Sequence, residues 1–223
     1  GGYMNSTLIL KGNILYTPRP SEFISIQHGY IIAVDGVVVY CGESIPPAYA
    51  DCEVTDYGDN LIIPGFVDTH AHAPQYCNRG LGMDKELLPW LETYTFPEEA
   101  KFSDLDYARL VYGAFVQDLW RNGTTRSILF GTIHKESTLV LMELLQKAGL
   151  SAYVGKVNMD RNSPDFLIEE TSQSLADTKE WLEASASFGP LVKPIITPRF
   201  VPSCTSELMD GLGTLSEEYN VPI

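Results

Sequence analysis

Apolar, strand-like segments alternate with helical segments over most of this chain, and this alternation limits the possible folds more than any other feature. We expect strands at 65–72, 124–130, 151–159 and 191–200, and helices at 103–122, 136–149, 163–189 and 205–220. Strands that alternate with helices of this length are typical of parallel βα units. Four units are visible, whereas a complete TIM barrel has eight. The sequence therefore predicts an α/β fold in which residues 64–223 form the first four βα units of a partial (β/α)8 TIM-like barrel.

Short sequence signals mark the ends of the expected helices. Ser103 and Asp106 have the spacing of a capping box before the first helix, and Asn122-Gly123 can end it. Pro164 stands where a helix tolerates proline in its first turn. We therefore expect the first helix to begin after Ser103 and the third to begin close to Pro164.

The region before the alternation consists of β-rich segments. Two β-branched runs are separated by Asp35-Gly36, a dipeptide that favours a tight hairpin because both turn positions need a positive φ. Further short apolar runs lie on either side of this hairpin. Residues 1–63 are therefore predicted to form part of a small β-sandwich, or a partial barrel.

Charge and cysteine content restrict the partners and the compartment. The formal net charge of -14 argues against nucleic acid and against anionic membrane surfaces, because both are polyanions. No apolar run approaches the roughly 20 residues that a membrane-spanning helix needs. The four cysteines form no CxxC pair, which favours a reduced, cytoplasmic protein over a disulfide-linked one.

Two histidines follow the first expected barrel strand. His70 and His72 are two residues apart, so on an extended strand their side chains point to the same side. The carboxyl-terminal end of a barrel strand is also the catalytic face of that fold. A bare HxH pair also occurs by chance, but this position favours a metal site. Asp68 would either orient an imidazole or bond to the nearby backbone.

The stretch "LIIPGFVDTHAH" resembles the first-strand signature of the amidohydrolase superfamily. These are metal-dependent hydrolases and deaminases on a distorted TIM barrel, often with a β-sandwich built from both ends of the chain. The stretches "HAPQY", "PWLETYTFP", "RNGTT", "YVGKVNMDRN" and "VKPIITPRFVPSC" together resemble the guanine deaminases within it. The resemblance extends from about residue 61 to residue 200.

The resemblance implies a zinc-dependent, hydrolytic deamination of guanine to xanthine and ammonia in purine catabolism. It assigns His70 and His72 to one zinc ion per complete active site, and it implies a homodimer. It assigns substrate binding to Gln75, Trp90, Arg199 and Phe200. The alternative is that these four residues are, in turn, a solvated loop residue, a core residue, half of a surface ion pair and a core residue.

The same resemblance places the remaining metal ligands on later barrel strands, together with the glutamate that transfers protons. We therefore expect no catalytic residue within this chain, no activity of the chain alone, and only weak zinc binding. His134 follows the second barrel strand, where it could cap the next helix, support the site or line the pocket, but we do not assign it as a ligand. Two other functions stay open: an aminohydrolase for 8-oxoguanine or a triazine, and a non-catalytic domain that retains the HxH pair.

Overall fold

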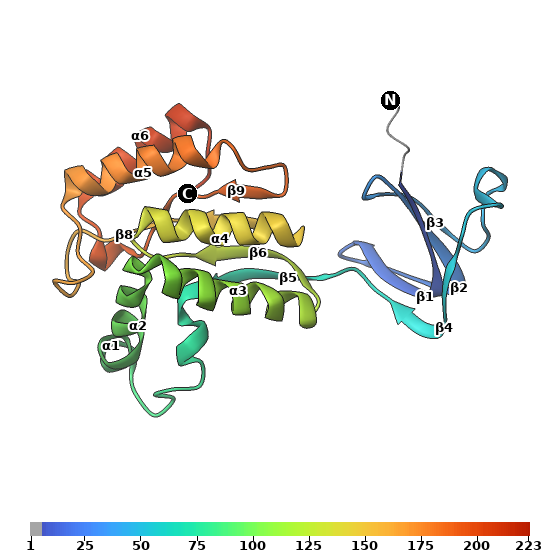
Figure 1. Ribbon diagram of the computed structural model, residues 1–223, viewed down its shortest axis with the longest axis horizontal. Coiled ribbons are helices and arrows are strands. Elements are labelled where there is room, and N and C mark those ends of the chain that lie inside the picture. The colour runs from blue at the N-terminus through green and yellow to red at the C-terminus, as the bar shows by residue number, and fades with distance from the viewer. Residues whose placement is uncertain (1–5) are drawn as a thin grey trace. The chain divides into compact units, whose positions relative to one another are not determined.

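The computed structural model describes residues 6–223, which form two compact units (Figure 1). The first unit ends at Pro64, and the second runs from Gly65 to Ile223. None of the helices in the described range combines the length and the apolar character needed to cross a membrane. The boundary between the units falls at the proline where the sequence pattern changes from β-rich to alternating.

The first unit is a single mixed sheet with the strand order β3-β2-β1-β4. Its strands are β1 (Thr7–Arg19), β2 (Glu22–Val34), β3 (Val37–Gly42) and β4 (Thr55–Ile62), with a short 3-10 helix, η1, at Pro47–Tyr49. Strands β1 and β4 are parallel, and the other neighbours are antiparallel. Ile9 of β1 is paired in register with Ile32 of β2, and both are buried; Ile14, which follows a register shift after Gly12, is buried as well.

The predicted hairpin at Asp35-Gly36 is confirmed. Val34 and Val37 are paired, so the loop between β2 and β3 has two residues. Their φ angles are 50° at Asp35 and 81° at Gly36. Positive φ at both central positions is the geometry that lets a two-residue turn follow the right-handed twist of its strands.

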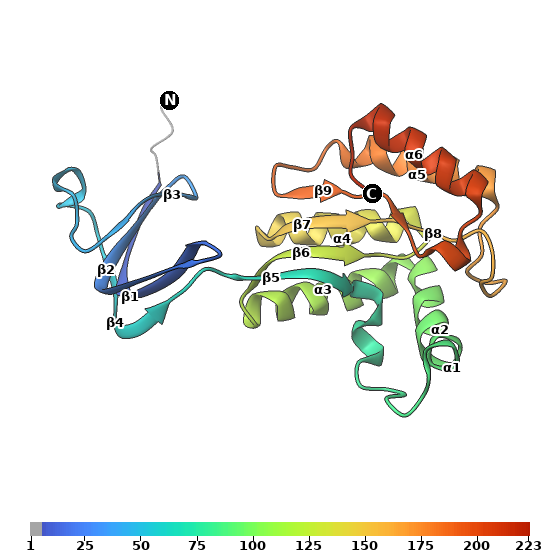
Figure 2. The same cartoon turned by 180° about the vertical axis from the view of Figure 1, so that it is seen from behind.

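The second unit contains a parallel sheet with the order β5-β6-β7-β9, seen in front of the helices in Figure 2. The strands are β5 (Phe66–His72), β6 (Thr124–Phe130), β7 (Ser151–Gly155) and β9 (Val192–Pro194). A separate pair is formed by β8 (Val157–Asn158) and β10 (Thr197–Pro198), also parallel. The expected strands 151–159 and 191–200 are therefore each divided in two, because their second halves leave the main sheet and pair with each other.

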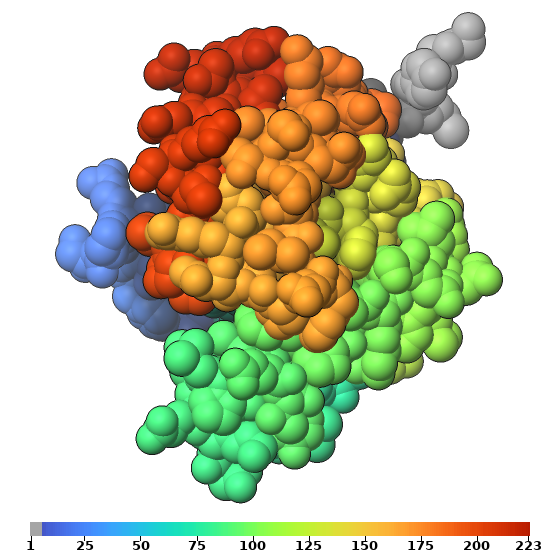
Figure 3. All heavy atoms as spheres, turned by 90° about the vertical axis from the view of Figure 1, so that its left-hand side faces the viewer, coloured from blue at the N-terminus to red at the C-terminus, as the bar shows by residue number. Residues whose placement is uncertain are grey.

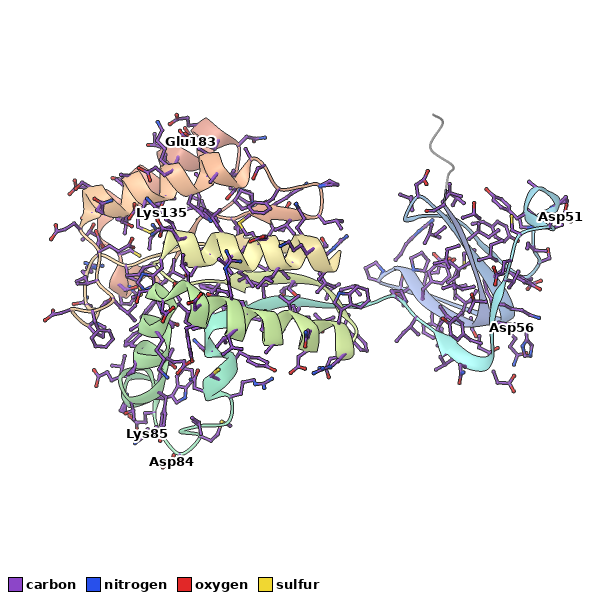
Figure 4. The ribbon with its side chains drawn as sticks, in the orientation of Figure 1. Asp51, Asp56, Asp84, Lys85, Lys135 and Glu183 are labelled. Atoms are coloured by element: carbon purple, nitrogen blue, oxygen red, sulfur yellow. The ribbon has the colours of Figure 1, made fainter. Side chains whose placement is uncertain are left out.

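The expected helices are present, with changes at their ends. The long helices are α3 (Leu105–Arg121), α4 (Lys135–Ala148), α5 (Thr171–Ser185) and α6 (Ser206–Tyr219). Figures 1 and 2 show α3 and α4 on one face of the sheet. Lys135 of α4 donates to Asp177 of α5 at 2.9 Å, and Tyr219 of α6 donates to Glu183 of α5 at 2.8 Å, so polar contacts tie α5 to both neighbours. Figure 4 labels Lys135 and Glu183 among the side chains.

Two of the predicted helix starts are wrong. Asp104, not Ser103, caps α3, because its carboxylate accepts from the backbone N–H groups of Asp106 and Tyr107. Residues 163–170 are not helical. In that segment the backbone N–H of Glu169 donates to the carbonyl oxygen of Met159 at 2.8 Å. This hydrogen bond replaces a helical one, and α5 begins only at Thr171.

Several short helices lie between β5 and α3. They are the 3-10 helix η2 (Ala73–Asn78), α1 (Leu87–Trp90), the π-helix η3 (Leu91–Thr95), α2 (Phe96–Ala100) and the 3-10 helix η4 (Lys101–Ser103). Another 3-10 helix, η5 (Val201–Ser203), follows β10. Figure 3 views the second unit from the carboxyl-terminal ends of its strands, and the segment from η2 to α2 (teal to green) forms part of the surface on this side.

Gly155, at the end of β7, permits a close approach to the chain around β10. A Cβ atom at this position would lie 1.7 Å from Thr197 Oγ1 and 3.0 Å from the carbonyl oxygen of Ile195. We expect Gly155→Ala to lower the free energy of unfolding by about 1–3 kcal/mol, because a packed interior cannot absorb the added atom without strain. Urea denaturation measures this change.

The matched control is Gly113→Ala in α3. A Cβ atom there would meet nothing within 4 Å. Since alanine favours a helix interior over glycine by up to about 1 kcal/mol, this variant is expected to be neutral or slightly stabilised. Equal loss of stability in the two variants would contradict the close approach at Gly155.

Candidate functional site

His70 and His72 lie in the last residues of β5, at the carboxyl-terminal edge of the parallel sheet. Their ring centroids are 5.2 Å apart, and the rings meet at 66°. The Asp68 side chain accepts from the backbone N–H of His70 at 3.0 Å, so it bonds to the nearby backbone rather than to an imidazole. The two imidazoles therefore lie side by side at the edge where parallel strands end.

The six residues predicted for the metal and substrate line one cavity of about 350 Å³. They come from β5, from the short helices that follow it, and from the segment after β10. The complete lining is His70, His72, Gln75, Leu87, Trp90, Leu91, Phe130, Arg199 and Phe200. The structure thus brings together side chains that are up to 130 positions apart in the sequence.

Phe130 is a lining residue that the sequence prediction missed. It ends β6 and is paired in register with His72 of β5. Its ring stacks on the His72 imidazole, with centroids 4.2 Å apart and an angle of 17°, and lies 5.1 Å from the His70 ring. The aromatic face restricts the orientation of both imidazoles. The strand register is the signal that could have found it, since both residues end neighbouring parallel strands.

The state of His72 suits a metal ion. Burial lowers its pKa to about 4, and the charges of Arg199 and His70 act in the same direction. The neutral imidazole that results is the form that coordinates metals. Its Nδ1 atom is buried and has no hydrogen-bond partner among residues 6–223. A buried ring nitrogen without a partner is costly, and a bound metal ion would satisfy the imidazole, so the histidine pair fits a metal site.

Two histidines do not complete such a site. Catalytic zinc usually takes three protein ligands and leaves one position open. Within the described residues, no group of three or more His, Cys, Asp or Glu side chains is arranged to hold a metal ion. The pair is therefore a partial donor set.

Arg199 forms a buried ion pair rather than a surface one. Its Nη1 donates to Glu99 Oε2 at 2.6 Å, and the two side chains are 5% and 1% exposed. Its guanidinium carbon also lies 5.2 Å from the centre of the Phe96 ring. Phe96 and Glu99 are three residues apart in α2, on one side of the helix. This helix therefore fixes the position of the guanidinium.

Gln75 and Trp90 reach the cavity from the segment after β5. Gln75 is half-buried in η2. The indole N–H of Trp90 donates to the carbonyl oxygen of Leu81 at 2.9 Å, which ties α1 to the preceding loop. The ring of Trp90 is left as an apolar wall of the cavity. Phe200 is 40% exposed, so it is not a core residue.

His134 lies outside this cavity. It occupies the position before α4, and its carbonyl oxygen accepts from the backbone N–H of Thr138. Its side chain lines a different cavity, together with Lys135 and Glu169. Burial and the neighbouring Lys156 lower its pKa. Of the three roles considered for His134, the structure places its backbone at the helix cap and its side chain away from the histidine pair.

The chain is similar to known guanine deaminases in both sequence and fold. The chain is 54% identical over 166 residues to the guanine deaminase of Dictyostelium discoideum, which is 74% of this chain and 37% of that protein. It superposes with a TM-score of 0.94 and 52% identity on the crystal structure of guanine deaminase from C. acetobutylicum with bound guanine in the active site, covering 97% of this chain and 52% of that one. The chain spans about half the length, or less, of the curated relatives it matches.

A more distant structure shares the fold alone. An adenosine deaminase from Xanthomonas campestris, with bound zinc, is 18% identical with a TM-score of 0.76, and the match covers 96% of this chain and 48% of that one. Residues 61–223 match the sequence model of the amidohydrolase family. This match takes in most of the chain, from the end of β4 through β5, the histidine pair and the Arg199 segment. The chain belongs to the amidohydrolase family.

Proposed function

We propose that this chain forms the guanine-binding part of a zinc-dependent guanine deaminase. The observation that carries the proposal is the single cavity in which His70, His72, Gln75, Arg199 and Phe200 meet. Its volume of about 350 Å³ is in the range of small-molecule sites. The reaction breaks a C–N bond of guanine, forms a C–O bond from water, and yields xanthine and ammonia.

The polar residues of the cavity match the edge of a purine. Arg199 has five N–H donors in a planar fork, and Glu99 occupies one of them. The remaining donors suit a ring carbonyl oxygen. The Gln75 amide offers both a donor and an acceptor, which suits an adjacent ring N–H or nitrogen. Trp90 and Phe200 supply apolar faces against the ring.

His70 and His72 are the residues that would hold the metal. Zinc in such a site lowers the pKa of water and so supplies a nucleophile near neutral pH. We propose that the other ligands, and the glutamate that transfers protons, lie outside residues 1–223. Within the chain, the stack between Phe130 and His72 and the bond from Asp68 to the His70 backbone hold the two imidazoles in place.

The same proposal extends to architecture and setting. The parallel sheet β5-β6-β7-β9, with its helices on one face, supports half of a TIM-like barrel in residues 64–223. The mixed sheet of β1 to β4 supports the N-terminal part of a β-sandwich in residues 1–63. We also propose a homodimer and a cytoplasmic location; the four free cysteines fit a reducing compartment.

The proposal is tested by assaying guanine conversion to xanthine in the whole protein, together with its metal content. Turnover of guanine with about one zinc per chain is expected. The 223-residue chain alone is expected to give no turnover. A preference for 8-oxoguanine or a triazine in the same assay would move the protein to another aminohydrolase. No turnover and no bound metal would favour the non-catalytic domain.

A further inference from the structure

Glu99 is the most buried carboxylate in the neighbourhood of the cavity, and its two carboxylate oxygens differ in their hydrogen bonding. On one side its Oε2 accepts from Arg199 at 2.6 Å. On the other side, Oε1 is buried with no hydrogen-bond partner among the residues that the structure describes. Burying a carboxylate without full pairing is costly, which points to a role for Glu99 beyond folding.

Arg199 acts directly on this carboxylate. Burial raises the pKa of Glu99, while Arg199 and, to a smaller extent, Gln75 favour its charged form. The 2.6 Å separation from Arg199 Nη1 is that of a charge-assisted hydrogen bond. Glu99 thus binds Arg199, which is one of the polar side chains that line the cavity.

We propose that Glu99 is a positioning residue that aims Arg199 at the purine and cancels the guanidinium charge. The proposal deepens the function proposed above and rests on it. Glu99 does not itself line the cavity. It acts through Arg199, which does line the cavity.

Charge cancellation has a consequence for ligand choice. A lone guanidinium would favour an anionic ligand over an uncharged one. The pair of Arg199 and Glu99 has no net charge, so the guanidinium can donate hydrogen bonds to a carbonyl without attracting anions. Glu99 is therefore a determinant of selectivity for uncharged purines.

The test compares Glu99→Gln with Glu98→Gln in the whole, zinc-loaded protein. Glu98 is the matched control: it is also buried, but it binds Lys101 and Tyr107 and lines no part of the cavity. Two competitive inhibitors of guanine turnover serve as probes. Hypoxanthine is an uncharged purine with a ring carbonyl, and urate is an anion in neutral solution.

In Glu99→Gln, hypoxanthine inhibition is expected to weaken roughly tenfold, because the donors lose their fixed direction. Urate inhibition is expected to stay the same or to strengthen. KM for guanine should rise by more than kcat falls. In Glu98→Gln, the two inhibition constants should keep their original ratio.

Two results would overturn the proposal. One is a parallel loss of hypoxanthine and urate inhibition in Glu99→Gln, which a merely structural role would give. The other is a Glu99→Gln variant that behaves like Glu98→Gln. If Glu99→Gln does not fold, Glu99→Asp serves as a second variant, since it keeps the charge but moves it back by one methylene. It should weaken inhibition by hypoxanthine more than inhibition by urate. Equal weakening of the two would overturn the proposal. Absence of guanine turnover in the unmodified protein would instead refute the proposed function.

Discussion

His72→Ala in the whole protein is expected to reduce kcat/KM for guanine by roughly 100-fold or more. The reason is that changes to residues that only support metal ligands already cost 10–100-fold in affinity or activity, and His72 is proposed as a ligand itself. Its Nδ1 is buried without a partner among the described residues, and its imidazole is neutral, so it is ready to donate to a metal. Zinc content should fall in step with activity.

The control for this variant is His28→Ala. His28 lies in β2 of the first unit, exposed, with its imidazole 3.7 Å from Asp59. This change removes the same side chain far along the sequence from the candidate site, and it should leave zinc content and kcat/KM unchanged. The measurements are metal analysis of the purified proteins and steady-state kinetics. A His72→Ala protein with full zinc content and normal turnover would exclude His72 as a ligand.

The position of the histidine pair could be predicted because it depends on local pattern alone. An apolar run ending in two histidines one residue apart fixes both the strand and the side on which the imidazoles lie. In a parallel sheet, the carboxyl-terminal ends of all strands meet at one edge. That rule alone does not place Arg199, because Arg199 follows β10, which pairs with β8 outside the main sheet, although Arg199 lines the same cavity as His70.

Glu99 could not be predicted in the same way. In the sequence it is the second of two adjacent glutamates, a pattern that usually belongs to a solvated helix face. Its burial depends on Arg199, which is 100 positions away. The only local hint is the spacing from Phe96, which puts both residues on one face of a helix. Contacts across such distances are set by packing, and a single sequence does not display packing.

The errors in the expected elements have the same origin. Residues 163–189 are predicted to be helical, with Pro164 in the first turn. In the structure, the side chain of Glu169 accepts from Lys156 at 2.7 Å and from the backbone N–H of Met159 at 3.1 Å. Lys156 is fully buried, and a buried ammonium needs a partner. The requirement to pair Lys156 outweighs the local helix propensity before Thr171, and nothing in the sequence marks Lys156 as buried.

Arg199→Met should remove guanine recognition and also destabilise the fold. Loss of a charged donor to a carbonyl is expected to lower kcat/KM for guanine roughly 100-fold. The effect should appear mainly in KM, because the histidine pair is untouched. Arg109→Met is the matched control: Arg109 is 53% exposed and pairs with Glu143 on the surface at 3.3 Å, so its loss should change neither kinetic constant and should cost less than about 1 kcal/mol of stability.

The stability of Arg199→Met should depend on pH in a defined direction. Without Arg199, burial alone acts on Glu99, so the pKa of this carboxyl should rise further in the folded protein. A folded state that holds its proton more tightly than the unfolded state is most stable at acidic pH and loses that stability as the pH rises through the folded pKa. Urea denaturation should therefore show a larger deficit for Arg199→Met at neutral than at mildly acidic pH. Adding Glu99→Gln should abolish this pH dependence, since no buried charge then forms. If Arg199→Met instead loses the same amount of stability at both pH values, Glu99 is not left unpaired when Arg199 is removed.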